Sequence, residues 1–208
     1  MPAGRPPEPT VATDGPHEAV DDASELAWLR RAEALGVPVT PMALVPAQVE
    51  ADFYRWNNLP ERIAALLADL DPRDPDEDDV EELLPTAAAW VRDHALLDAV
   101  VDTFYDALSG LPPRVTVRRP GAPGVVAGRG RPALIAVKRA WAEDWLLAPS
   151  VARAREGRGW LPAPRPVLVH AADLRADPAV AAAAENALGR PVAAWSDGEG
   201  RLARLGLG

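Results

Sequence analysis

Residues 166–196, PVLVHAADLRADPAVAAAAENALGRPVAAWS, carry the clearest structural pattern in the chain. Residues 167–170 are mostly apolar and have the length of a short buried strand. The Asp-Pro pair at 177–178 is a typical start of a helix, and Gly189 is a typical end of one. Residues 192–195 form a second apolar run. A strand, a helix and a strand in this order predict a βαβ unit with parallel strands.

A second β pattern precedes this unit. Residues 114–119 (RVTVRR) alternate as a strand does, residues 120–124 (PGAPG) favour a turn, and residues 125–127 supply a returning strand. We expect a helix over 132–147 and a last short strand over 201–205, after a turn at Asp197 and Gly198.

The N-terminal half has helical periodicity instead. We expect helices from Asp21 or Asp22 to Gly36, over 46–57, from Pro60 to Leu70 and over 86–109, with a proline-rich connector at 37–46. Residues 1–20 read as a disordered, Pro-rich arm. The sequence therefore predicts an α+β fold, with a helical N-terminal half packed on a small mixed sheet that ends in the βαβ unit. The alternative is an α/β fold. We expect one globular domain at 21–208, helical over 21–112 and mixed over 113–208.

Composition narrows the range of functions. The 208 residues include three His and no Cys. The lack of Cys excludes disulfides, thiolate metal sites and cysteine nucleophiles. No run approaches the ~20 apolar residues of a membrane span, so we expect a cytoplasmic protein without membrane contact. Phosphate-loop, dinucleotide-binding, nucleophile-elbow and zinc-protease motifs are absent, and we expect no cofactor and no metal. One lysine beside many arginines is typical of a bacterium with a GC-rich genome.

Charge is distributed unevenly along the chain, whose formal net charge is −9. Residues 1–106 are strongly acidic, whereas residues 107–142 hold seven bases and no acid. Either the two parts neutralise each other inside the fold, or the basic segment faces outward and attracts an anion. The acidic total and the lack of aromatic residues among the bases disfavour nucleic acid as a partner.

Lys138, the only lysine, is the first candidate catalytic residue. On the helix expected over 132–147 it falls on the apolar arc, between Leu134 and Ile135. A lysine surrounded by apolar groups acquires a lowered pKa and can act as a base or nucleophile. The alternative is a stem that lies along the core while its ammonium reaches water or an acid.

Asp93 and His94 form the second candidate. On a continuous helix over 86–109, Asp93 lies within the apolar face, and His94 shares one side with Asp98 and Asp102. Such a group could be a general acid–base cluster or a metal half-site on a single helix. The alternative is structural, with Asp93 paired to an arginine of the basic segment.

The third candidate is an anion site in the segment 114–139. Gly128 and Gly130 permit close backbone approach, and a helix begins at Pro132. The arginines that would hold the anion are Arg118, Arg119, Arg129 and Arg131. His170, which ends a strand near Asp173, is a weaker ligand-site candidate.

Two functional hypotheses follow. In the first, the protein is an accessory or adaptor protein that binds another protein, through the acidic helical surface, including residues 74–79, or through the Pro-rich arm. In the second, it is a small enzyme or binding protein for an anionic, phosphorylated or similar small molecule. The seven Trp would also suit a homodimer interface.

Overall fold

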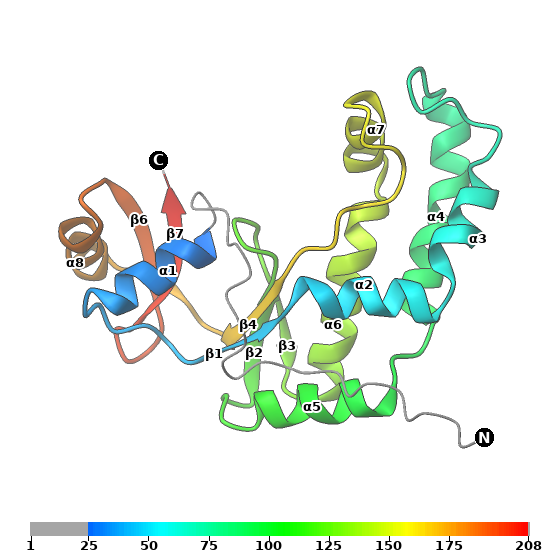
Figure 1. The fold of residues 1–208 in the computed structure, drawn as a ribbon. Helices are drawn as coiled ribbons and strands as arrows, with labels where there is room; N and C mark the ends of the chain where they lie inside the picture. Colours follow the sequence, from blue (N-terminus) through cyan, green and yellow to red (C-terminus); the bar gives the residue numbers. More distant parts are fainter. Residues whose placement is uncertain (1–24, 208) are drawn as a thin grey trace, which may run out of the picture.

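The computed structural model describes residues 25–207. The Pro-rich arm and the expected helix start at Asp21 or Asp22 lie outside these residues. In Figure 1 a group of helices lies on one side of a small central sheet, and α1, α8, β6 and β7 lie on the other side.

Seven strands form two separate sheets in the described part of the chain. The central sheet has the order β1-β4-β2-β3, with bounds β1 Met42–Val45, β4 Val167–Ala171, β2 Arg114–Arg118 and β3 Val125–Gly128. The second sheet has the order β5-β6-β7, with bounds β5 Arg175–Ala176, β6 Val192–Ser196 and β7 Leu202–Leu207. All pairings between these strands are antiparallel.

The helices surround these sheets. Their bounds are α1 Glu25–Ala34, α2 Ala47–Trp56, α3 Leu59–Leu66, α4 Glu77–Asp93, α5 Asp98–Leu108, α6 Arg131–Ala142, the 3-10 turn η1 Glu143–Trp145, α7 Leu147–Arg155 and α8 Pro178–Leu188. Within residues 25–207, no helix has the length and apolar character needed to cross a bilayer.

β4, which has a neighbouring strand on each edge, is buried on both faces of the central sheet, which explains its nearly continuous apolar run. Val167 and Val169 belong to the core cluster shared with the helices, together with Val115 and Val117 of β2. Leu168, which points to the opposite face, belongs to a second core cluster with residues of α1, α8, β6 and β7. We call these the helical face and the C-terminal face of the sheet.

The α+β class is confirmed, whereas the parallel βαβ unit is wrong. The predicted strand, helix and strand at β4, α8 and β6 exist, and Asp177 caps α8 by accepting hydrogen bonds from Ala179 N and Val180 N. However, β4 already has antiparallel neighbours on both edges, β1 and β2, so β6 pairs with β5 and β7 in the other sheet. The central sheet is therefore antiparallel and not mixed.

The expected long helix over 86–109 is two helices. α4 begins earlier, at Glu77, because Asp76 accepts a hydrogen bond from Asp78 N and caps the helix. It continues through Pro85 and ends at Asp93, and α5 begins only at Asp98. Apolar residues keep a helical spacing on both sides of the break, so the hydrophobic periodicity did not indicate where α4 ends.

Two other boundaries differ from the prediction. The connector at 37–46 contains β1, whose four residues are all apolar and therefore show no alternation. The helix expected over 132–147 is α6, which ends at Ala142. The chain then forms η1 and a separate helix, α7. The hairpin of β2 and β3 is as predicted, and Gly124 is required there because a Cβ would lie 2.3 Å from Thr116 Cγ2.

Candidate functional site

Arg118 is the last residue of β2, and Arg119 follows it directly. Successive side chains of a strand alternate, so these two leave the sheet on opposite faces. On the C-terminal face, Arg118 donates to both carboxylate oxygens of Glu25, at 2.5 and 2.8 Å. Its Nε donates to Nε2 of His170 at 3.0 Å, and Nη2 donates to the carbonyl of Ala203 at 3.2 Å. The guanidinium is almost completely buried.

Glu25 is equally enclosed and fully hydrogen-bonded. Besides Arg118, its carboxylate accepts from the backbone N–H of Gly121 at 2.7 Å and of Leu205 at 2.9 Å. The first turn of α1 is thereby joined to the β2–β3 turn and to β7. The buried charge has an opposite charge and four donors, as its desolvation requires.

His170 completes this group on β4. Burial lowers the pKa of its imidazole to about 4, with Arg118 adding a smaller effect in the same direction. Nδ1 bonds to the carbonyl of Ala171 at 2.9 Å, so in the neutral ring Nδ1 donates and Nε2 accepts from Arg118. His170 is therefore a buried structural acceptor.

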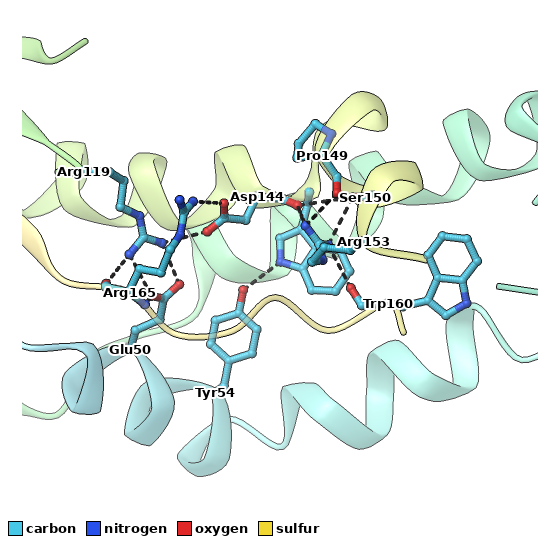
Figure 2. Close-up of polar contacts among 10 residues, drawn as sticks. Glu50, Tyr54, Arg119, Asp144, Pro149, Ser150, Arg153, Trp160 and Arg165 are labelled. Atoms are coloured by element: carbon cyan, nitrogen blue, oxygen red, sulfur yellow. Dashed lines mark hydrogen bonds and ion pairs between the residues drawn. The ribbon is translucent and has the colours of Figure 1, made fainter. Parts of the chain in front are cut away.

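Arg119 builds a larger network on the helical face, shown in Figure 2. Its guanidinium donates to both oxygens of Glu50 on α2, each at 2.9 Å, and to Asp144 Oδ2 in η1 at 2.8 Å. Arg165 contributes its backbone N–H to Glu50 and its guanidinium to Asp144 Oδ1. Burial raises the pKa of the Glu50 carboxyl, although the bonds to Arg119 oppose this effect.

The same network continues into α7. Trp145 Nε1 donates to the hydroxyl of Tyr54 at 2.7 Å, and burial raises the pKa of that phenol. Arg153 donates to the carbonyls of Asp144 and Trp160, both at 2.8 Å. In Figure 2 these contacts lie next to the Arg119 network, and together they join α2, η1, α7 and the loop that follows α7. All these donors and acceptors serve internal packing.

The structure thus contradicts the anion-site role of Arg118 and Arg119. Both side chains are buried and bound to carboxylates of this chain, so neither can meet a ligand from solvent. The other interpretation of the charge pattern holds here, because Glu25 and Glu50 of the acidic half neutralise two bases of the basic segment.

Lys138, His94 and Asp93 come together at the end of α4. Lys138 Nζ donates to the main-chain carbonyl of His94 and lies 5.7 Å from the ring centroid of Phe53. Burial lowers the pKa of Lys138, and the nearby charge of Asp93 opposes this. An ammonium at the carboxyl end of a helix interacts favourably with the last carbonyls. Lys138 therefore stabilises the break between α4 and α5.

The imidazole of His94 faces away from this contact. Its Nε2 accepts from Arg62 at 2.5 Å, and Nδ1 bonds to the carbonyl of Trp90 at 2.8 Å. Asp98 and Asp102 lie on α5, beyond the break, so the expected row along one helix does not form. Residues 25–207 contain no group of three or more His, Cys, Asp or Glu arranged to hold a metal.

Arg129 and Arg131 follow β3 and are both exposed. Arg129 Nη1 donates to the carbonyls of Ser109 at 2.8 Å and Leu111 at 2.5 Å, just beyond α5. Its backbone N–H donates to Pro113 at 2.8 Å. The structure therefore leaves these two of the four predicted arginines near solvent.

Arg129 also lines a polar cleft of about 490 Å³. The cleft lies between the loop after α5 and the β6–β7 turn, where Asp197 and Arg201 line it. A second pocket is apolar and lies beneath α5, α6 and β1. Its free space of about 20 Å³ holds little more than one water-sized sphere.

The sequence reasoning missed Glu25, Glu50, Asp144 and Arg201. Glu25 and Glu50 did carry a signal, because each lies within three residues of the start of an amphipathic helix and among apolar residues. Their partners are 93 and 69 residues away, a pairing that helical periodicity does not encode. No family model, no curated protein and no solved structure matches this chain.

Proposed function

We propose that this protein is an accessory or adaptor protein that binds an extended, acidic segment of another protein along the free edge of β3. The single observation that carries this proposal is an unprotected strand edge with exposed apolar side chains and exposed bases beside it.

Among residues 25–207, β3 is the last strand of the central sheet and pairs only with β2. Its outer row of N–H and C=O groups is therefore available to another strand. Soluble proteins usually protect such an edge with a charge or a proline, but Val125–Gly128 contains neither. The side chains of Val125 and Val126 are 46% and 50% exposed.

The surroundings of this edge indicate the chemistry of the partner. Ile135 belongs to α6, a helix that packs against β3, and its side chain is also 44% exposed. Arg129, Arg131 and Arg139 are exposed in the same segment, which contains no acid. An extended segment with alternating apolar and acidic residues complements both features.

The test uses two labelled synthetic peptides, one alternating Val with Glu and the other alternating Val with Lys. Fluorescence anisotropy should show binding of the Val/Glu peptide that is about tenfold tighter than that of the Val/Lys peptide, and weaker at high salt. A Val/Glu peptide with alternate residues N-methylated should bind much more weakly, because it cannot donate along the strand edge. Equal binding of the two unmethylated peptides, or none, overturns the proposal.

Val126→Glu should weaken binding of the Val/Glu peptide by at least about tenfold, because it places a like charge on the edge. Leu35→Glu is the matched control, since Leu35 is 53% exposed and follows α1. Both variants should keep their stability to within about 0.5 kcal/mol, as surface substitutions do. If the free protein is a dimer that Val126→Glu dissociates, a second copy occupies the edge and the proposal is wrong.

A further inference from the structure

We propose that the polar cleft between the loop after α5 and the β6–β7 turn is a binding site for a small molecule, whose carboxylate or phosphate group lies between Arg129 and Arg201. This site lies at the seam between the two sheets and does not depend on a partner at β3.

The size and position of the cleft suit a small ligand. Its volume of about 490 Å³ is that of a typical metabolite site, and such sites often lie where two structural units meet. Here the 109–112 loop and the segment before β1 form one wall, and the turn over 197–201 forms the other.

Arg129 is held in place at the first wall while part of its guanidinium stays available. Within the part of the chain that the structure describes, only Nη1 is engaged, by the carbonyls of Ser109 and Leu111. A guanidinium carries five N–H donors, so those on Nε and Nη2 have no partner among residues 25–207. These donors are positioned before any ligand binds, which lowers the entropic cost of binding.

Arg201 is held in a similar way at the second wall. Its Nε donates to Asp197 Oδ2 at 2.9 Å, and its Nη1 lies 3.0 Å from Glu199 Oε2. Its Nη2 has no further partner within the described residues. About a third of the side chain is exposed, so the remaining donors can reach a ligand.

The cleft also contains two carboxylates, Asp197 and Glu199, which differ in how far they neutralise Arg201. Asp197 is buried, and its oxygens accept from Thr40 Oγ1 at 2.6 Å, from Arg201 Nε and from the backbone N–H groups of Glu199 and Arg201. This carboxylate is already compensated. Glu199, in contrast, is largely exposed and competes with a ligand for Arg201. A carboxylate or phosphate that binds two guanidiniums matches the donors that remain.

Titration calorimetry of the full-length protein with inorganic phosphate, and separately with succinate, tests this inference. Arg201→Gln should weaken binding of the better probe by about tenfold, because one charge-assisted contact is lost. Glu199→Gln should strengthen it, because the competing carboxylate is removed. Arg155→Gln is the matched control, since Arg155 is an exposed arginine paired with Glu77 on α7 and α4. The ratio of the two affinities distinguishes a phosphate-bearing from a carboxylate-bearing ligand.

Two results would overturn the inference. One is phosphate and succinate affinity that stays unchanged in both Arg201→Gln and Glu199→Gln. The other is an adventitious ion only, seen as heat that chloride at the same ionic strength reproduces. Arg201→Gln should leave binding of the Val/Glu peptide unchanged, so failure of this site and failure of the β3 proposal are distinguishable.

Discussion

The two faces of the central sheet hold neighbouring arginines in contrasting ways. On the C-terminal face, Arg118 is enclosed with one carboxylate and a neutral imidazole, and none of these groups reaches solvent. On the helical face, Arg119 shares two carboxylates with Arg165, whose side chain is 53% exposed. The charges of Arg118 and Glu25 cancel on the first face, and those of Arg119 and Arg165 cancel with Glu50 and Asp144 on the second. The C-terminal end of β2 therefore carries a fully buried ion pair on one face and, on the other, a network that reaches solvent through Arg165.

The largest expected effect comes from removing either arginine. Arg118→Met and Arg119→Met should each lower the free energy of unfolding by ~3–5 kcal/mol, because each leaves a carboxylate buried without its charge partner. Urea denaturation measures this. In the double variant Glu25→Gln with Arg118→Met, much of the loss should return, since no buried charge remains unpaired.

Hydrogen exchange sharpens the comparison between the faces. Arg118→Met should expose the amide of Leu205, which donates to Glu25, while α2 stays protected. Arg119→Met should give the reverse pattern. Identical exchange profiles in the two variants would show that both faces unfold as one cooperative unit. The two arginines would then not stabilise separate regions.

A smaller effect is expected from acid on the C-terminal face. The pKa of His170 is about 4 in the folded protein, below the ordinary value of 6.5, so the unfolded chain binds the proton more strongly. This contribution to stability is complete above pH 6.5 and is lost as the pH falls toward 4. It amounts to about 3 kcal/mol across that window.

His170→Gln tests this, because an amide oxygen can still accept from Arg118 but does not titrate. The wild type should lose more stability than His170→Gln between pH 6.5 and 4, measured by urea denaturation at each pH. The carboxyl of Asp197 has a pKa of about 2 and so titrates below this window. Parallel pH profiles for the two proteins would contradict the burial of a neutral imidazole.

The smallest of these effects concerns Lys138 on the helical face. Lys138→Met should lower the free energy of unfolding by about 1 kcal/mol, because the carbonyl at the end of α4 loses a charged donor. Lys138 is the only lysine, so acylation followed on the peptide that contains it, as a function of pH, reports its pKa, which should lie below 10.5. An unchanged stability would contradict the capping role and favour the catalytic hypothesis.

Local features of the fold could be predicted from the sequence. Asp177, Pro178 and Gly189 define the start and end of α8 through backbone geometry alone, and the structure has them there. The β2–β3 hairpin likewise follows from alternation and a glycine-containing turn. Such signals act over a few residues, so one chain is sufficient to read them.

Pairings between distant segments could not be predicted. β4 and β6 are separated by a helix, which favours a parallel pair, but β1 and β2 occupy both edges of β4. The contacts of the candidate site could not be predicted for the same reason, because they also join segments that are distant in sequence. Arg118 and Arg119 looked like free bases because Glu25, Glu50 and Asp144 approach them only in three dimensions.

The bond between Glu25 and the amide of Leu205 joins two segments that the ribosome makes far apart in time. The charged groups of the helical-face network all lie at or before Arg165, and β4, which joins β1 to β2, follows directly at Val167–Ala171. The carboxylate of Glu25, in contrast, has a complete set of donors only after residue 205 has been made. During synthesis α1 therefore waits for β7, and incompletely packed segments of this kind are the ones that aggregate.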